Sequence, residues 1–323
     1  MKIAVMGKIH IDGLEILKKA NLKYFEIYNF EESNLKKELK DVDAIILRTA
    51  NLNSSVLSCC KNLKIVSRHG VGYDNVDLEY LNQEQIGLGI TSTSNAVSVA
   101  EHVMTMLLYL SRKINLSDQL TRNGNFKQKN TLPDFYELYE KNILIFGFGR
   151  IGKALAKRCM AFETNVYVCD PFVDDKIIKE NGCYPINKLE GLKIADCISI
   201  HLPLNEKTKN FISYDDFKIT KPNLILINTS RGEIINEEAL YDVLNQNKIS
   251  GAGLDVYNNE PPLKDNPLFS LSNTVLTPHN SALTLGCRKR MAIETFENIL
   301  YYLTGDQLLN KKNIINNKII GMN

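Results

Sequence analysis

The amino-acid sequence predicts a two-domain α/β protein in which each domain is a doubly wound parallel sheet covered by helices. Three observations lead to this prediction. Short apolar runs alternate with helical patterns along almost the whole chain, as expected of parallel strands that are buried on both faces. A glycine-rich turn near mid-chain joins one of these runs to a helix. The 323 residues exceed what one small core needs, so we expect two domains around a cleft.

The composition indicates an ordinary globular protein. Hydrophobic residues make up 44% of the chain, and 39 basic against 37 acidic residues leave a net charge of +2. This balance gives no electrostatic basis for binding nucleic acid or a membrane. No apolar run could cross a bilayer, and the first ten residues have a strand pattern rather than that of a signal peptide. The seven cysteines lack metal-ligand spacing, so we expect reduced thiols, no metal and a cytoplasmic location.

The first domain is expected to contain both ends of the chain. Residues 1–94 alternate strand and helix patterns, and from Asn95 a long helical pattern leads into the second domain. After Ala282 another helical pattern leaves that domain, and the last twenty residues are expected to return to the first. We therefore assign residues 1–94 and 283–323 to a flavodoxin-like substrate domain and residues 95–282 to an inserted nucleotide domain.

The segment KNILIFGFGRIG, residues 141–152, has the strand, G-x-G-x-x-G and helix order of a dinucleotide-binding fingerprint. Gly147 makes the tight turn, Gly149 lets a pyrophosphate approach the backbone, and Gly152 lets the helix pack on the strand. Asp170 follows the next strand about 20 residues on, where an acid holds the ribose hydroxyls, which favours NAD over NADP. The alternative is a glycine turn in an ordinary βαβ unit, with Asp170 a turn residue. The prediction is a Rossmann domain that binds NAD.

Three residues with catalytic potential follow later strands of the same domain. Arg231, Glu260 and His279 come after the predicted strands 224–228, 252–255 and 274–277. Because ligands bind beyond the carboxyl ends of parallel strands, we expect these side chains to converge on the cofactor. An arginine can grip a carboxylate, a histidine can move a hydroxyl proton, and a carboxylate can orient the histidine. This set suits hydride transfer between NAD and a hydroxy acid, although Glu260 as a solvated turn acid and Arg231 as a surface charge remain alternatives.

Seven segments, in order, resemble the D-isomer-specific 2-hydroxyacid dehydrogenase family, and the resemblance covers nearly the whole chain. They are RHGVGYDNVD (68–77), NAVSVAEHVM (95–104), NILIFGFGRIG (142–152), HLPLNEKT (201–208), INTSRGEIINEEAL (227–240), GLDVYNNEPP (253–262) and TPHNSA (277–282).

The resemblance implies an NAD-dependent oxidoreductase for a D-2-hydroxy acid, with a homodimer built through the nucleotide domain. It implies that His279 is the acid/base of a catalytic trio with Arg231 and Glu260. It implies that backbone N–H groups at Val71 and Gly72 bind the substrate carboxylate. The implied cofactor contacts beyond the glycines are Arg150, Ile151, Asp170, His201, Pro203, Thr208, Thr229, Ser230 and Asp255. We expect His201 to form a wall of that site without a proton role, His102 to be structural, and His69 to shape its glycine turn.

The substrate prediction depends on Arg48. Arg48-Thr49-Ala50 follows a strand of the first domain and resembles the segment with which phosphoglycerate dehydrogenases meet the substrate phosphate, and the final KKNIIN resembles the short form of that enzyme. The resemblance implies 3-phosphoglycerate and 3-phosphohydroxypyruvate, hence serine biosynthesis. If Arg48 instead pairs with a local acid, glyoxylate or hydroxypyruvate reduction or another D-2-hydroxy acid is the alternative. A remote alternative is an NAD-sensing corepressor, which binds protein partners.

Overall fold

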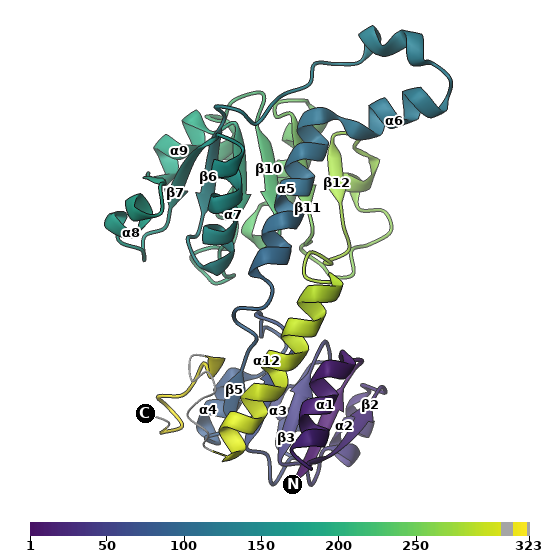
Figure 1. The fold of residues 1–323 in the computed structure, drawn as a ribbon, viewed down its shortest axis with the longest axis vertical. Helices are drawn as coiled ribbons and strands as arrows, with labels where there is room; N and C mark the ends of the chain where they lie inside the picture. The colour runs from purple at the N-terminus through teal and green to yellow at the C-terminus, as the bar shows by residue number, and fades with distance from the viewer. Residues whose placement is uncertain (305–312, 322–323) are drawn as a thin grey trace. The chain divides into compact units, whose positions relative to one another are not determined.

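The computed structural model describes residues 1–304 and 313–321, and the chain forms two compact units (Figure 1). The first unit contains Met1–Asn95 and Leu283–Asn323, and the second contains Ala96–Ala282.

The first unit contains a five-stranded parallel sheet with the strand order β2-β1-β3-β4-β5. This is the flavodoxin-like doubly wound order that the sequence predicted. Its strands are β1 (Lys2–Met6), β2 (Lys23–Ile27), β3 (Ala44–Leu47), β4 (Ile65–Arg68) and β5 (Gly87–Gly89). Its helices are α1 (Ile11–Lys19), α2 (Glu32–Glu38), α3 (Ser54–Leu57), α4 (Leu78–Gln83) and α12 (Leu285–Thr304).

The last helix of the chain packs on the first one. A Cβ on Gly13 of α1 would lie 2.7 Å from the ring of Phe296 on α12, so the glycine permits this close approach. The chain then reaches β5, where Gly89 and Ile314 form an antiparallel bridge. Residues 313–321 thus belong to the first unit, and residues 305–312 and 322–323 of the expected returning segment lie outside the described residues.

The second unit contains a seven-stranded parallel sheet with the order β12-β11-β10-β9-β6-β7-β8. The order reverses between β6 and β9, as in a Rossmann sheet. Its strands are β6 (Asn142–Phe146), β7 (Asn165–Cys169), β8 (Tyr184–Pro185), β9 (Cys197–Ile200), β10 (Ile225–Asn228), β11 (Gly251–Leu254) and β12 (Thr274–Leu276). The sequence predicted six of them. It missed β8, which has two residues and is too short to show a periodic pattern.

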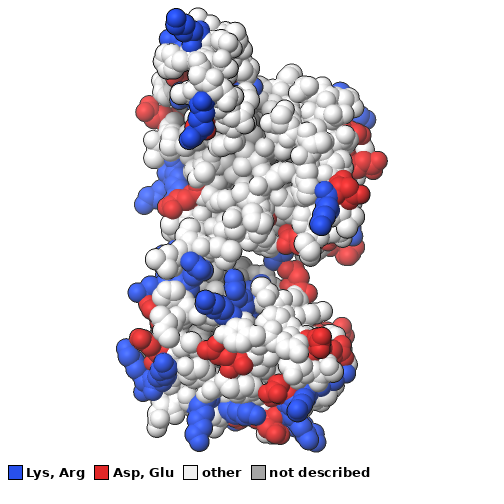
Figure 2. All heavy atoms as spheres, turned by 90° about the vertical axis from the view of Figure 1, so that its right-hand side faces the viewer, with Lys and Arg blue, Asp and Glu red and all other residues white. Residues whose placement is uncertain are grey.

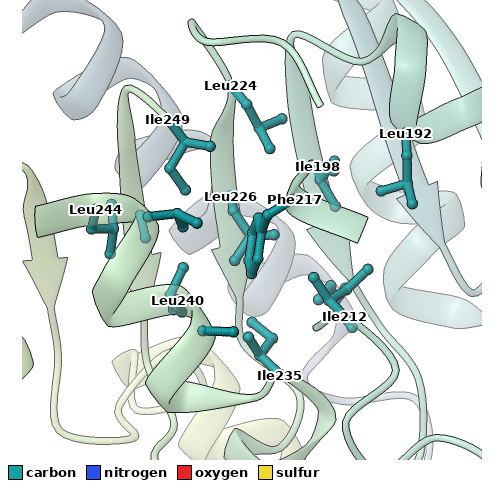
Figure 3. Packing of buried hydrophobic residues seen from close by; sticks show 14 of the residues in the cluster. Leu192, Ile198, Ile212, Phe217, Leu224, Leu226, Ile235, Leu240, Leu244 and Ile249 are labelled. Atoms are coloured by element: carbon teal, nitrogen blue, oxygen red, sulfur yellow. The ribbon is translucent and has the colours of Figure 1, made fainter. Parts of the chain in front are cut away.

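Helices cover both faces of this sheet. They are α5 (Ala96–Arg112), α7 (Arg150–Ala161), α8 (Asp175–Glu180), α9 (Lys188–Ile194), α10 (Tyr214–Phe217) and α11 (Glu237–Asn245). Along β6, Ile143 and Ile145 enter the core beneath α5 and α7, whereas Leu144 and Phe146 enter the opposite core, which is shown in Figure 3. This alternation along a strand that is buried on both faces explains why the fingerprint strand is apolar at every position after Asn142.

The segment after α5 differs from the sequence prediction. The sequence predicted a helix through Ile114 and a polar loop from Thr121 to Glu137, but α5 ends at Arg112 and Lys113 takes a left-handed φ of 44°. A second helix, α6 (Ile114–Arg122), and a 3₁₀ turn, η1 (Phe126–Thr131), follow. Neither buries a residue, and Figure 1 shows this arm (residues 113–135) extending away from the sheet of its own unit.

Acidic and basic side chains are interspersed over the face that Figure 2 shows, in keeping with the near-balance of charges in the sequence. Within residues 1–304 and 313–321, every helix is too short or too polar to span a membrane.

Candidate active site

The glycines of the fingerprint differ in what surrounds them. Gly147 takes a φ of +92°, and a Cβ there would lie 2.5 Å from the carbonyl oxygen of His201. A Cβ on Gly152 would lie 2.1 Å from the carbonyl oxygen of Gly147, so the start of α7 packs directly on the turn. A Cβ on Gly149 would meet nothing within 4 Å. The first and last glycines are therefore required by the protein's own packing, whereas the middle one faces open space.

That open space lies at the amino end of α7. Gly149 is the N-cap and offers no side-chain bond to the helix. The first N–H groups of the helix, at Arg150 and Ile151, have no partner inside it and form a site for a phosphate.

Asp170 directly follows β7 and fixes the glycine turn. One carboxylate oxygen accepts the N–H of Phe148 at 2.7 Å, and the other accepts the N–H of Phe172 at 2.9 Å. The turn residue Phe148 is therefore held by the same carboxylate that the sequence analysis expects to meet the ribose. Each oxygen keeps a lone pair that a hydroxyl could use.

The loop after β9 forms another side of this site. The N–H of His201 continues the strand pairing to Phe146, and its ring Nε2 lies 2.9 Å from Ser199 Oγ. Burial lowers the pKa of His201 to about 3, so the ring is neutral near pH 7 and suits a wall without a proton role. Thr208 donates its hydroxyl hydrogen to the carbonyl of Pro203 at 2.6 Å, which closes the loop.

Two buried polar atoms, on the residues directly after β9 and β10, have no hydrogen-bond partner among the described residues. They are Nδ1 of His201, after β9, and Oγ1 of Thr229, after the neighbouring β10. An unpaired buried polar group costs roughly 1–3 kcal/mol, so both atoms are suited to a polar ligand. Together with the open side of Gly149, they show that the residues present fit a dinucleotide.

Arg231 lies in the turn after β10, and its backbone is fixed on both sides. The side chain of Asn228 donates to the carbonyl of Arg231 at 2.8 Å and accepts from the N–H of Ser230 at 3.0 Å. A Cβ on Gly232 would lie 2.0 Å from the carbonyl carbon of Tyr257. The turn that carries Arg231 therefore packs on the backbone after β11, close to the loop that carries Glu260.

Glu260 and His279 form a pair. Glu260 Oε2 lies 2.6 Å from His279 Nδ1, and Oε1 accepts the N–H of Tyr257 at 3.2 Å. Burial acts to raise the pKa of Glu260, but His279, the Tyr257 N–H and the charge of Arg231 together hold it below its ordinary value. The side chain of His279 is 49% exposed, and its Nε2 has no hydrogen bond to the described residues. The pair can thus present Nε2 to a ligand while the carboxylate orients the ring.

The backbone around His279, which we call the His279 turn (residues 277–281), rests on Asp255. His279 has a φ of +50°, which is uncommon for a residue other than glycine. The carboxylate of Asp255 is fully buried and accepts the N–H groups of Asn280 at 2.8 Å and Ser281 at 2.9 Å. The resemblance implies that Asp255 contacts the cofactor. In the structure its oxygens hold the turn that carries His279.

The predicted substrate residues of the first unit gather after β3 and β4. Val71 and Gly72 are partly buried in the loop after β4, and Arg48 follows β3. Among the described residues Arg48 has no acidic partner, and its Nη1 lies 3.5 Å from the carbonyl oxygen of Lys8. The described residues therefore give no support to the alternative that Arg48 pairs with a local acid.

His69 lies close to two arginines in this unit, because it follows Arg68 and its N–H donates to the carbonyl of Leu47, the residue before Arg48. It is buried, and its pKa is lowered to about 4. Burial is the largest cause, and the positive charges of Arg48 and Arg68 add to it. Arg68 ends β4, and its Nη1 donates to the carbonyl of His69 at 2.5 Å. Two guanidinium groups therefore act on a neutral imidazole at this end of the sheet. Arg68 is not among the residues predicted from the sequence, although an arginine at the end of a strand meets the same topological rule that selected Arg231.

Comparisons with known proteins agree with this geometry. The family model described as "D-isomer specific 2-hydroxyacid dehydrogenase, NAD binding domain" matches residues 104–281. The D-3-phosphoglycerate dehydrogenase of Archaeoglobus fulgidus is 32% identical over 315 residues, which cover 97% of this chain and 59% of that protein. The chain thus spans less than two thirds of that relative.

Two further relatives match over nearly their full length. The glyoxylate reductase of Pyrococcus furiosus is 32% identical over 328 residues, with 96% of each chain covered. The solved D-lactate dehydrogenase of Aquifex aeolicus, complexed with NAD and lactic acid, has a TM-score of 0.85 at 26% identity and covers 97% of this chain and 98% of its own.

Proposed function

Because the chain belongs to the D-isomer-specific 2-hydroxyacid dehydrogenase family, with NAD as its cofactor, we propose that it interconverts 3-phosphoglycerate and 3-phosphohydroxypyruvate. The family, the NAD cofactor and the two parallel-sheet domains were predicted correctly from the sequence. The phosphorylated substrate and the role of each residue are the proposal. The observation that carries it is Arg48, which follows β3 in the first unit and has no acidic partner among the described residues.

The proposed cofactor site is the edge of the second unit around Gly149. The N–H groups of Arg150 and Ile151 hold the pyrophosphate, and Asp170 accepts the ribose hydroxyls. His201 Nδ1 and Thr229 Oγ1 receive the polar partners that they lack among the described residues. The remaining proposed cofactor contacts are Pro203, Thr208, Ser230 and Asp255. Of these, Asp255 acts through the His279 turn.

The proposed chemistry at the substrate uses three side chains of the same unit. NAD supplies or accepts the hydride when it is bound. Arg231 binds the substrate carboxylate and the neighbouring carbonyl oxygen as a bidentate donor. His279 Nε2 gives a proton to the oxygen when the 2-oxo acid is reduced and takes it back in the reverse direction. Glu260 holds the imidazole through Nδ1 and favours its protonated form.

The first unit contributes further proposed substrate contacts. Backbone N–H groups at Val71 and Gly72 contribute to carboxylate binding, and Arg48 together with Arg68 binds a phosphate. A guanidinium matches phosphate geometry, and Arg48 has no acidic partner among the described residues.

A steady-state NADH absorbance assay tests the proposal with phosphohydroxypyruvate, hydroxypyruvate, glyoxylate and pyruvate. We expect Arg48→Ala to raise KM for phosphohydroxypyruvate about 10- to 100-fold and to leave KM for hydroxypyruvate within about threefold, since one charge-assisted contact contributes roughly 1.5–3 kcal/mol. Lys64→Ala is the matched control. Lys64 precedes β4, so it lies at the opposite edge of the parallel sheet from Arg48, which follows β3. Its removal also deletes one positive charge. Equal KM losses for both substrates would return Arg48 to a structural role.

One relative favours a second candidate function. The Pyrococcus furiosus glyoxylate reductase matches this chain over 96% of both lengths, so reduction of glyoxylate or hydroxypyruvate is the alternative within the family. Turnover of glyoxylate far above phosphohydroxypyruvate would establish it. Absence of turnover with every 2-oxo acid would instead favour an NAD-binding corepressor.

We also propose that the protein is a cytoplasmic homodimer and acts in serine biosynthesis. All seven cysteines are free, which suits a reducing compartment. The arm exposes Ile114 and Phe126 at 50% and 65%, and a second copy of the chain would cover them.

A further inference from the structure

Helix α5 carries a histidine that reaches the His279 turn. His102 Nε2 lies 3.1 Å from Thr277 Oγ1 and 3.8 Å from Asp255 Oδ1, and its side chain is 21% exposed. The proposed proton transfer and cofactor binding make no use of His102, and the sequence predicts a structural role for it.

The hydrogen bonds at Thr277 determine which group donates. Thr277 Oγ1 lies 2.6 Å from Asp255 Oδ1, and two oxygens at that distance share a hydrogen. A threonine hydroxyl carries a single hydrogen, so once it is given to the carboxylate, Oγ1 can only accept at its other contact. His102 Nε2 must therefore be the donor. The result is a directed chain from His102 through Thr277 to Asp255.

This chain ends on the backbone that carries His279. The carboxylate of Asp255 accepts the N–H groups of Asn280 and Ser281, the two residues after His279. The carbonyl of Thr277 accepts the N–H of His279 at 3.1 Å. Because His279 has a φ of +50°, the turn persists only if its surroundings hold it in that conformation.

His102 also decides where the Thr277 hydroxyl points. The carbonyl oxygen of Leu254 lies 3.5 Å from Thr277 Oγ1 and is a second possible acceptor. A donor from His102 occupies a lone pair of Oγ1 and aligns its hydrogen with Asp255. Without that donor, the hydroxyl can rotate toward Leu254, and the fully buried carboxylate loses a hydrogen bond.

We propose that His102 is a positioning residue for the proposed reaction, acting through Thr277 and Asp255 to hold His279 in place. This role requires no contact of His102 with the substrate or the cofactor. The inference rests on the proposed function in so far as His279 transfers the proton.

The test compares variants that keep or remove the donor. His102→Gln places an amide N–H close to the position of Nε2, whereas His102→Phe keeps the ring shape without a donor. We expect His102→Phe to lower kcat about tenfold with KM for the 2-oxo acid within about twofold, and His102→Gln to stay within about threefold of wild type, as the loss of one hydrogen bond implies. Thr105→Ala is the control on the same helix, because its hydroxyl bonds to the carbonyl of Glu101 and not to the turn.

A second measurement does not depend on turnover. Amide hydrogen exchange at Asn280 and Ser281 should be faster in His102→Phe and unchanged in His102→Gln and Thr105→Ala. Wild-type kcat and exchange in His102→Phe, or equal impairment of His102→Phe and His102→Gln, would overturn the proposal. If the wild-type protein reduces no 2-oxo acid, the proposed function fails, while the exchange rates still decide the role of His102.

A third variant covers the case in which His102→Phe does not fold. Asparagine is shorter than glutamine and places its N–H near the Nδ1 position, out of reach of Thr277. We then expect His102→Asn to show the loss of kcat and the faster exchange, and His102→Gln to show neither. Equal behaviour of these two variants would overturn the proposal.

Discussion

Alanine at Gly149 and at Gly152 should have opposite consequences, although the two glycines are only three positions apart in the fingerprint. A Cβ on Gly152 would lie 2.1 Å from the carbonyl oxygen of Gly147, and backbone cannot move aside as a flexible side chain can. We expect Gly152→Ala to destabilise the second unit by about 3 kcal/mol, the upper end of overpacking costs. For a unit of this size that corresponds to a fall in Tm of roughly 6–12 °C.

Gly149→Ala should leave the fold intact and weaken the cofactor. Its Cβ would meet nothing within 4 Å, and its φ of −71° is accessible to alanine. Replacing glycine at an N-cap by alanine costs about 0.5–1 kcal/mol, so Tm should change by only a few degrees. The added methyl group would occupy the space through which a pyrophosphate approaches, and we expect the Kd for NADH to rise by about 10- to 100-fold, or roughly 1.4–2.7 kcal/mol.

Thermal unfolding and titration of NADH fluorescence measure the two effects separately. The absence of tryptophan from the chain simplifies the fluorescence titration, because energy transfer from tryptophan does not contribute. Wild-type affinity for NADH in Gly149→Ala would refute the reasoning, because the space beside Gly149 would then not be needed by the pyrophosphate. A wild-type Tm in Gly152→Ala would refute the packing argument independently.

Two further predictions concern the pair at the candidate site and the arm. Glu260→Gln should lower kcat/KM for the 2-oxo acid about 5- to 30-fold, the lower range for a charge-assisted hydrogen bond because the pair is partly exposed. Because the pKa of Glu260 lies below its ordinary 4.5, the wild-type pair should persist until the pH falls below about that value, and a pH-rate profile of Glu260→Gln should lack this acid limb. Phe126→Glu should shift sedimentation from the proposed dimer to a monomer. The change in Tm should be small, since Phe126 is 65% exposed within its own chain. Lys127→Glu is the control for the added negative charge. An unchanged dimer in Phe126→Glu would exclude the arm as the contact.

Much of the fold could be predicted because the parallel strands are buried on both faces. Strands such as β6 and β10 are apolar at nearly every position, which marks them in the sequence even without alternation. The errors fall where this signal is weak. β8 has only two residues. The helix break at Lys113 depends on a left-handed φ, and no glycine or asparagine at that position indicates it in the sequence. The exposed helix α6 buries nothing, so its apolar positions resemble a continuation of α5.

The sequence could predict where the candidate site lies, but not the contacts that hold its side chains in place. Residues after strand ends, such as Arg231 and His279, follow from topology. The contacts that hold them join residues far apart in sequence, so no local pattern contains them. Gly232 against Tyr257, and Asn228 against the carbonyl of Arg231, could only be found from the folded backbone.

The two aspartates that follow strands show why topology locates a residue without orienting it. Asp170 and Asp255 follow β7 and β11, so the strand-end rule treats them alike. Asp170 stays partly exposed and binds the N–H groups of Phe148 and Phe172, and its lone pairs remain available beside the glycine turn. Asp255 is fully buried beneath the His279 turn. Whether a strand-end carboxylate meets a ligand or supports the residue that does is decided by the next loop, and for Asp255 that loop contains two N–H groups and the Thr277 hydroxyl within reach.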